Sequence, residues 1–200
     1  MGKEIDNRCL PDIWDRFKSG DKEAFAVLYN LHIDSLYHYG TKFCKDEEVI
    51  KDALQEIFIE FYLKHDRINV APENLKYYLL LVLKRNLIKK LEAGRKISHE
   101  FIETVHFEPE YNIEFQIIEM EKDVEINSKV LYAINQLPAK QKEAIYLRFN
   151  ESLEYDEIAI ILEITVESVR KQVYRALKTV REIIDNDSIK IPYTNLLKKS

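Results

Sequence analysis

The sequence predicts an all-α protein made of two helical blocks joined by an acidic linker. Glycine and proline together make up 9 of the 200 residues, where an average chain of this length has about 24, so the turns of a sheet protein are missing. Apolar residues recur at intervals of three and four, which is the repeat of a helix with one buried face. The longest apolar run, residues 77–83, has seven residues, and a membrane-spanning helix needs about 20, so we expect no membrane insertion.

The first block, residues 8–96, is expected to fold as a helical bundle. A short helix carries Trp14, which packs this helix against three longer ones. The first of these follows Asp21, whose carboxylate is suited to accept hydrogen bonds from the free amides at a helix start. The second is expected to begin at Asp46, and its apolar stripe is broad enough to be buried on more than one side. The third covers residues 73–94, apolar in its first half and basic in its second.

Charge separates the two blocks. Residues 1–96 carry 17 lysines and arginines against 16 aspartates and glutamates, and residues 129–200 carry 12 against 10. Residues 97–128 carry 1 against 9, so this one segment supplies the whole acidity behind the net charge of −5. We therefore expect a solvated acidic linker at residues 97–124. Residues 185–200 form a C-terminal tail without an assigned role.

The second block, residues 125–184, ends in the most specific pattern of the chain. Residues 153–184 read LEYDEIAIILEITVESVRKQVYRALKTVREII. Two segments with the apolar spacing of a helix follow each other there, with three or four residues between them. Thr165 is placed to cap the second helix. This is the geometry of a helix-turn-helix. One continuous apolar stripe of the second helix is expected to point inward: Val169, Val173, Ala176, Val180 and Ile184.

The opposite face of that second helix is polar and basic. Arginine and lysine suit guanine edges and phosphates, and glutamine suits adenine, so the residue types fit a reader of the DNA major groove. An amphipathic surface helix with a solvated basic face is the alternative. The preceding short helix, the tight turn and the cap favour DNA binding. The candidate DNA-contacting residues are Ser168, Arg170, Lys171, Gln172 and Arg175.

Residues 153–184 resemble region 4 of the extracytoplasmic-function sigma factors, the small two-domain members of the sigma-70 family. The upstream residues 134–149, INQLPAKQKEAIYLRF, resemble the start of the same region. The resemblance implies that the five candidate residues recognise the minus-thirty-five promoter element. One position departs from the family, which has glycine in the turn where this chain has Glu163. Two outcomes are open for this turn. Either Glu163 adopts a left-handed conformation at a cost of about 1 kcal/mol, or the turn differs in detail from that of the family.

The first block resembles region 2 of the same family. The resemblance lies in residues 20–40, GDKEAFAVLYNLHIDSLYHYG, and in residues 52–62, DALQEIFIEFY. It implies that the helix at residues 52–62 binds the clamp helices of core RNA polymerase. Exposed acids and a glutamine are also common on ordinary helix surfaces, so this pattern alone leaves both interpretations open. The side chains expected to project toward that partner are Asp52, Gln55, Glu56 and Ile59.

The third helix resembles regions 2.3 and 2.4, which implies that it binds and opens the minus-ten promoter element. Its basic end suits a phosphate backbone, although cations are also favoured at the C-terminus of any helix. The loop at residues 66–74 corresponds by resemblance to the segment that traps a flipped promoter base. The candidate minus-ten residues are Lys84, Arg85, Asn86, Lys89 and Lys90.

The linker has two interpretations. In the family it enters the nucleic-acid channels of the polymerase, and carboxylates interspersed with Phe101, Phe107 and Tyr111 would there mimic a single strand. A solubilising spacer is the equal alternative.

No catalytic or metal site emerges from the sequence. His32, His38 and Cys44 are spaced by six residues, about 240° around a helix, so they do not converge as metal ligands do. The chain has no CxxC, no HExxH and no glycine-rich phosphate loop. We expect no metal, no cofactor and no catalysis, and, from the polar N-terminus, a cytoplasmic protein.

The resemblance implies three partners, namely core RNA polymerase, promoter DNA and an anti-sigma factor. Two other functions stay open from the residues. One is a helix-turn-helix regulator with a helical sensor domain, which binds its operator without polymerase. The other is a helical adaptor whose basic faces bind acidic proteins.

Overall fold

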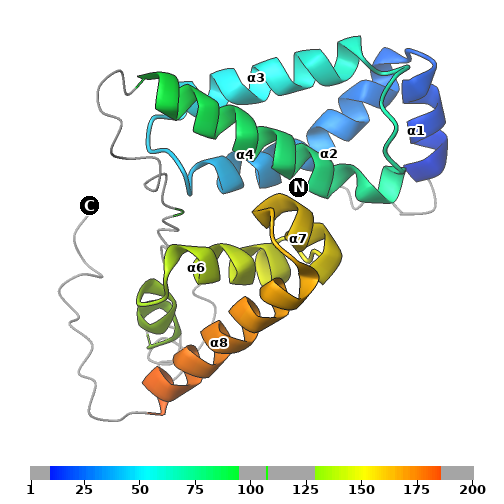
Figure 1. Ribbon diagram of the computed structural model, residues 1–200. Coiled ribbons are helices and arrows are strands. Elements are labelled where there is room, and N and C mark those ends of the chain that lie inside the picture. Colours follow the sequence, from blue (N-terminus) through cyan, green and yellow to red (C-terminus); the bar gives the residue numbers. More distant parts are fainter. Residues whose placement is uncertain (1–9, 95–106, 108–128, 186–200) are drawn as a thin grey trace, which may run out of the picture. The chain divides into compact units, whose positions relative to one another are not determined.

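The computed structural model describes residues 10–94, 107 and 129–185, and the regular elements in these residues are all helices (Figure 1). This confirms the predicted all-α class. The chain divides into two compact units, residues 1–106 and 107–200. Most of the predicted linker and residues 186–200 of the predicted tail lie outside the described residues, so the predicted domain boundaries stay a prediction.

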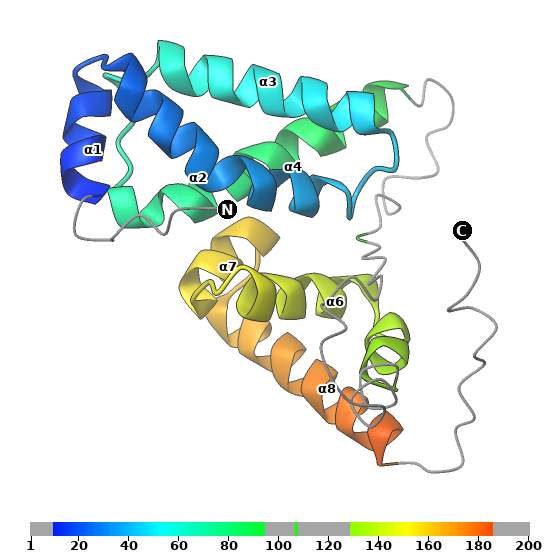
Figure 2. The same cartoon turned by 180° about the vertical axis from the view of Figure 1, so that it is seen from behind.

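The first unit is a bundle of three long helices with a short helix at one end. Figures 1 and 2 show it from opposite sides. Helices α2, α3 and α4 each pack against the other two, while α1 packs against α2 and η2. The elements are α1 (Leu10–Lys18), α2 (Lys22–Gly40), α3 (Glu47–Leu63), η2 (Pro72–Asn74) and α4 (Leu75–Gly94).

Two aspartates start the helices of this bundle as the sequence predicts. The Asp21 carboxylate accepts a hydrogen bond of 2.8 Å from the amide of Glu23 at the start of α2. The Asp46 carboxylate accepts one of 3.0 Å from the amide of Glu48 at the start of α3. Each cap satisfies an amide that has no partner within its helix and contributes about 1 kcal/mol.

Aromatic rings join α1 to the rest of the bundle. Phe17 stacks on Phe61 of α3 with 4.5 Å between ring centroids, and Trp14 lies 5.4 Å from Phe17. Both α1 aromatics are buried, which confirms the predicted packing of the short helix. Burial of large aromatic side chains supplies much of the hydrophobic free energy of a small domain.

The second unit is built around its last helix. Helix α8 packs against α6 and α7. Of its predicted inward stripe, Val169, Val173 and Ala176 are buried, whereas Val180 and Ile184 are half-buried. Residues 129–135 are also helical. The other elements are α6 (Ala139–Ile145), the π-helical segment η3 (Tyr146–Asn150), α7 (Tyr155–Leu162) and α8 (Val166–Ile184).

The turn between α7 and α8 is left-handed. Glu163 ends α7 with φ 54° and ψ 41°. Thr165 then caps α8, its hydroxyl oxygen accepting a hydrogen bond of 3.2 Å from the amide of Ser168. The cap is as predicted. Of the two alternatives for the turn, the structure has the left-handed one, so a glutamate occupies backbone space that glycine enters more easily.

Phe107, which falls in the predicted linker, belongs to the second unit. It is 2% exposed, and its ring meets Tyr146 edge-on at 5.5 Å between centroids. A ring buried in this way is not displayed as the strand-mimic interpretation requires.

Candidate nucleic-acid interface

Helix α8 presents its basic face to solvent. Arg170, Lys171 and Arg175 are exposed, whereas Ser168 and Gln172 are half-buried. The burial of Val169, Val173 and Ala176 on the other side of the helix sets this orientation, because residues three and four apart share a face. The structure therefore turns Arg170, Lys171 and Arg175 outward, whereas Ser168 and Gln172 lie beside the buried stripe. Arg170 and Gln172 are about 160° apart around the helix, so the five predicted residues do not share one narrow face.

Helix α7 contacts the first of these arginines. The guanidinium carbon of Arg170 lies 5.6 Å from the ring centroid of Tyr155, and that of Arg148 lies 5.0 Å from the same centroid. Arg148 is further held by Glu154 at 3.1 Å, and the first cause of its raised pKa is this hydrogen bond to the Glu154 carboxylate. Cation–π contacts of this kind orient a guanidinium while leaving its N–H groups available.

Two other predicted residues have partners within α8 and its cap. The hydroxyl of Ser168 lies 2.8 Å from that of Thr165, so Ser168 takes part in the cap. The ammonium of Lys171 lies 2.6 Å from a carboxylate oxygen of Glu167, one turn earlier. Such exposed pairs are weak, and a phosphate can replace the carboxylate.

Two exposed apolar residues on α8 escaped the sequence analysis. Tyr174 is 69% exposed and Leu177 is 46% exposed. The periodicity that turns Val173 inward turns Tyr174 outward, next to Arg175, so the signal was present in the helical pattern. Apolar groups on a groove-reading helix can contact thymine methyl groups.

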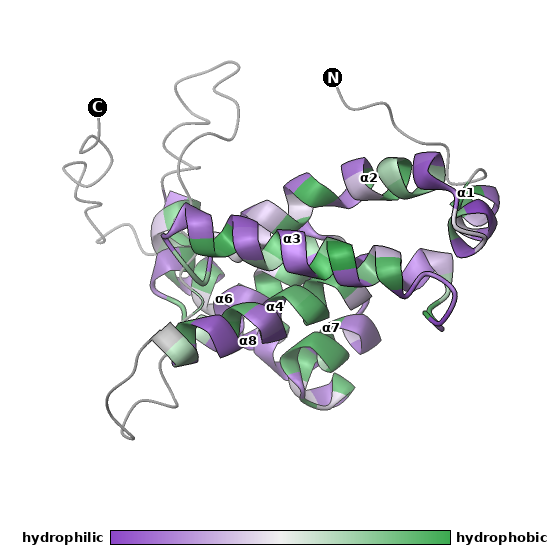
Figure 3. Ribbon diagram, turned by 90° about the horizontal axis from the view of Figure 1, so that it is seen from above, coloured by the Kyte–Doolittle hydropathy of each residue, from purple (hydrophilic) through white to green (hydrophobic). Residues whose placement is uncertain are grey.

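On α3 the four predicted polymerase-facing residues are exposed. Along this helix, pairs of exposed residues alternate with pairs of buried ones, and the exposed positions include Asp52, Gln55, Glu56 and Ile59. Figure 3 shows hydrophilic and hydrophobic positions alternating along α3. Ile59 is 51% exposed. An exposed isoleucine among polar residues gives this face an apolar contact point.

A groove with a volume of about 550 Å³ adjoins that face of α3. Its walls come from α2 and α3, and Gln55 and Ile59 are among the lining residues. Aromatic side chains of α2 complete it, Tyr29 and Tyr37 included. The groove is open and mostly apolar, which suits the apolar face of a helix from another protein.

The predicted minus-ten residues of α4 do not share one environment. Arg85 and Lys89 are exposed. Lys84 is half-buried, and its ammonium lies 6.0 Å from the centroid of the Phe43 ring. Asn86 and Lys90 point toward α3, so only part of the predicted cluster faces solvent directly.

Those remaining two residues bind Glu56. Asn86 donates a hydrogen bond of 3.1 Å to one carboxylate oxygen of Glu56, and Lys90 donates one of 2.7 Å to the other. The Lys90 bond is the first cause, and the Asn86 bond the second, of a pKa of Glu56 below its ordinary value. Glu56 was expected to be free for a partner protein and is instead bound within the bundle. The structure thus joins two predicted sites that the sequence keeps 30 residues apart.

One histidine lies inside the first unit. His32 of α2 is 8% exposed, and its Nε2 has no hydrogen-bond partner among the described residues. Burial, and secondarily the charge of Lys76, lowers its pKa to about 4. Across the described ranges, no group of three His, Cys, Asp or Glu residues is placed to hold a metal ion. Across those same ranges, no helix has the length and apolar character needed to cross a membrane.

Two models of one protein family match the chain. The model described as Sigma-70 region 2 matches residues 28–97, and the model described as Sigma-70, region 4 matches residues 128–180. The first match lies in the bundle that carries α3 and α4, and the second contains the helix-turn-helix.

Curated relatives match the chain over nearly their full length. It is 29% identical over 179 residues to the RNA polymerase sigma-H factor of Pseudomonas aeruginosa, covering 86% of this chain and 89% of that protein. It is 28% identical over 194 residues to the ECF RNA polymerase sigma-E factor of Haemophilus influenzae, covering 93% and 97%.

A solved structure has the same fold. The sigma factor RpoE from Bartonella quintana, in complex with the anti-sigma factor NepR, aligns with a TM-score of 0.57 and 20% identity, covering 82% of this chain and 99% of that one. The family matches fall on the two units and together span more than half of the chain. The chain therefore belongs to the sigma-70 family, as a sigma factor of the extracytoplasmic-function type.

Proposed function

We propose that this chain binds core RNA polymerase and directs transcription initiation at promoters, recognising the minus-ten element with its first unit and the minus-thirty-five element with its second. The observation that carries the proposal is the exposed face of α8. There Arg170, Lys171 and Arg175 project from a capped helix-turn-helix whose other face is buried.

Recognition of the minus-thirty-five element uses the major groove. Arg170 and Arg175 suit guanine edges, and Gln172 suits adenine. Lys171 exchanges Glu167 for a phosphate, and Ser168 keeps the helix start in place through its contact with Thr165. Tyr155 orients Arg170 through its ring. The recognition helix is thereby positioned before DNA arrives.

Recognition of the minus-ten element uses the basic end of α4. Arg85 and Lys89 are exposed for phosphates. Lys84, Asn86 and Lys90 lie beside them, and the latter two reach DNA after leaving Glu56. An unpaired base of the same element is read by the loop that precedes η2, since bases out of the stack expose their edges.

The polymerase binds along α3. Asp52, Gln55 and Ile59 face outward beside the groove lined by α2 and α3. Glu56 lies on the same face and is also tied to α4, so the polymerase-binding helix and the DNA-binding helix move together.

The chain has no catalytic role of its own in this proposal and acts in the cytoplasm, where core polymerase supplies the chemistry. A solved relative is described in complex with an anti-sigma factor. We extend that relationship here and expect an anti-sigma protein that covers the polymerase-binding and DNA-binding surfaces.

The test begins with purified full-length chain and core RNA polymerase. Co-purification, followed by initiation from a library of genomic promoter fragments, is the expected result. Binding of DNA without polymerase association would instead identify an operator-binding regulator. Binding of neither would leave the adaptor function and overturn the proposal.

A further inference from the structure

We propose that Lys18, at the end of α1, is a positioning residue that holds the loop between α3 and η2 in the shape needed to read an unpaired base of the minus-ten element. This inference rests on the proposed function. It assigns a role in DNA recognition to α1, a helix that carries none of the predicted DNA-binding residues.

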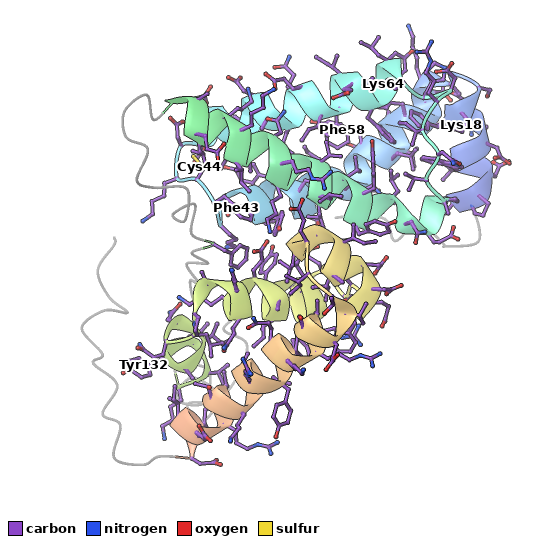
Figure 4. The ribbon with its side chains drawn as sticks, viewed as in Figure 1. Lys18, Phe43, Cys44, Phe58, Lys64 and Tyr132 are labelled. Atoms are coloured by element: carbon purple, nitrogen blue, oxygen red, sulfur yellow. The ribbon has the colours of Figure 1, made fainter. Side chains whose placement is uncertain are left out.

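Lys18 binds the loop through two of its backbone carbonyls. Its ammonium donates hydrogen bonds of 3.0 Å to the carbonyl oxygen of Asp66 and 2.7 Å to that of Ile68. These residues lie 48 and 50 positions away in the sequence. In Figure 4, Lys18 lies where α1 meets the chain that descends to η2. A single ammonium with three N–H donors can therefore fix the spacing of two carbonyls across the loop.

The base of the loop is braced by the same end of α1. The ring of His65 lies 6.2 Å from that of Phe17, and its Nδ1 is 2.8 Å from the carbonyl oxygen of Tyr62. Gly20, just after α1, adopts φ 90°, and a Cβ placed on it would lie 3.4 Å from Nε2 of His65. The turn that follows α1 and the start of the loop are therefore in close contact.

The fixed backbone leaves polar side chains pointing to solvent. Asp66, Arg67 and Asn69 are exposed. The weak pair between Asp66 and Arg67, at 3.8 Å, leaves their side chains 59% and 83% exposed. Arginine suits guanine, asparagine suits adenine, and aspartate accepts from cytosine. Three side chains of base-reading type thus stand on a loop whose carbonyls turn inward to Lys18.

This arrangement lowers the cost of base recognition. A loop that is ordered on folding does not have to be ordered again on binding. The free energy of its contacts with the correct base is therefore not reduced by an entropy cost of ordering the loop. A loop without the Lys18 bonds adapts to several bases and distinguishes them less. Lys18 acts on selectivity through the loop backbone and does not itself contact DNA.

The experiment compares holoenzymes reconstituted with the wild-type chain and with Lys18→Met, which keeps an apolar stem and removes the donors. Both transcribe a promoter library randomised across the minus-ten element. The preference for the favoured base over the others is expected to fall about tenfold at one or two positions, within the range of a single base contact. The minus-thirty-five preference and the affinity for core polymerase should stay unchanged.

Two further variants separate positioning from folding. Lys18→Arg can still donate to both carbonyls and should restore most of the preference. Lys22→Met removes an exposed lysine just beyond the brace and should behave as wild type. If Lys18→Met melts at a lower temperature, the library is transcribed well below that temperature. Asn69→Ala, which leaves the brace intact, is then expected to lose preference at one position.

A wild-type minus-ten preference in the Lys18→Met holoenzyme would overturn the inference. A wild-type chain that initiates with a minus-thirty-five preference and no minus-ten preference would also overturn it. That result would remove the minus-ten part of the proposed function and leave polymerase binding and minus-thirty-five recognition in place. Failure of the wild-type chain to associate with core polymerase would remove the proposed function itself.

Discussion

The ammonium of Lys90 lies 2.7 Å from a carboxylate oxygen of Glu56 and joins α4 to α3. Asn86 binds the other oxygen of the same carboxylate. One acidic side chain of the proposed polymerase-binding helix thus neutralises a cation of the proposed DNA-binding helix. In the proposed function, Glu56 takes before DNA binding the place that a phosphate takes afterwards.

Glu56→Gln should tighten DNA binding by the full-length chain. The substitution keeps the length of the side chain and an acceptor oxygen and removes the charge that pairs with Lys90. Lys90 then reaches phosphate without first leaving a carboxylate, and an exposed ion pair of this kind is worth about 0.2–1 kcal/mol, so Kd at a fixed salt concentration should fall by about 1.4- to 5-fold. Fluorescence anisotropy with labelled duplex DNA at one low salt concentration measures Kd.

Glu60→Gln is the matched control for that variant. Glu60 lies on the same helix and pairs with Lys64, a residue outside the proposed DNA surface. Its Kd for DNA should equal that of the wild type. An equal Kd for the wild type and both variants would mean that Lys90 does not reach phosphate.

Arg175→Ala should weaken and relax recognition of the minus-thirty-five element. Loss of a guanidinium from a bidentate base contact costs about 1–3 kcal/mol of discrimination. Footprinting with the reconstituted holoenzyme on a promoter series varied in that element measures both effects. Arg181→Ala, at the exposed last turn of α8, is expected to footprint normally. An unaltered footprint for Arg175→Ala would count against the assignment.

Ile59→Ala should weaken binding to core polymerase. The side chain is 51% exposed beside the groove, and burial of such a side chain in an interface is worth about 1–2 kcal/mol, or 5- to 30-fold in Kd. Titration with labelled core polymerase measures the change. Ile160→Ala removes a comparably exposed isoleucine from α7 and should bind normally. Equal affinities for the two variants would place the polymerase elsewhere.

Glu163→Gly should be more stable than Glu163→Ala. Both substitutions remove the side chain, but only glycine relieves the positive φ of 54° at this turn. The difference in unfolding free energy is expected to be about 1 kcal/mol, reduced by the extra freedom of glycine in the unfolded chain. Urea unfolding of the two variants gives the difference. A less stable glycine variant would mean that the turn is not strained.

The stability of the first unit should fall in acid because of His32. Its pKa is lowered from 6.5 to about 4 by burial, so between these values the unfolded chain binds a proton that the native chain does not. Unfolding free energy is therefore lost as pH falls from 6.5 to about 4, by about 3 kcal/mol in total, and is unaffected by this group above 6.5.

His32→Leu is the variant that tests this origin. It removes the titrating group from the core, so the variant should lose less unfolding free energy in acid than the wild type does. The carboxylates contribute equally to both proteins. Urea unfolding at pH 7.5 and at pH 4.5 measures the two losses. An equal loss in both proteins would assign the acid sensitivity to other groups.

Local patterns anticipated much of the fold and of the α8 surface. The caps at Asp21, Asp46 and Thr165 depend on residues two or three positions away, and the outward position of Arg175 follows from a helical period that buries Ala176. Such features are encoded within one or two turns of chain, so a single sequence carries them.

Features that join distant segments were not anticipated. Glu56 was expected to be free because helical spacing places it outside the buried stripe of α3, but spacing does not say that Asn86 and Lys90 of another helix lie opposite. Lys18 belonged to no pattern, since its partners are backbone carbonyls some 50 residues away. Phe107 read as part of a solvated linker and is buried against Tyr146.

By itself, the sequence determined the helical class, the resemblance to sigma regions 2 and 4, and the residue types available to read DNA, because periodicity, caps and motifs are local properties. The tertiary structure decided which charges are paired, which loop is braced and which backbone is strained. Those outcomes depend on which helices pack against each other, and the free energy that selects one packing comes from side chains far apart in the chain.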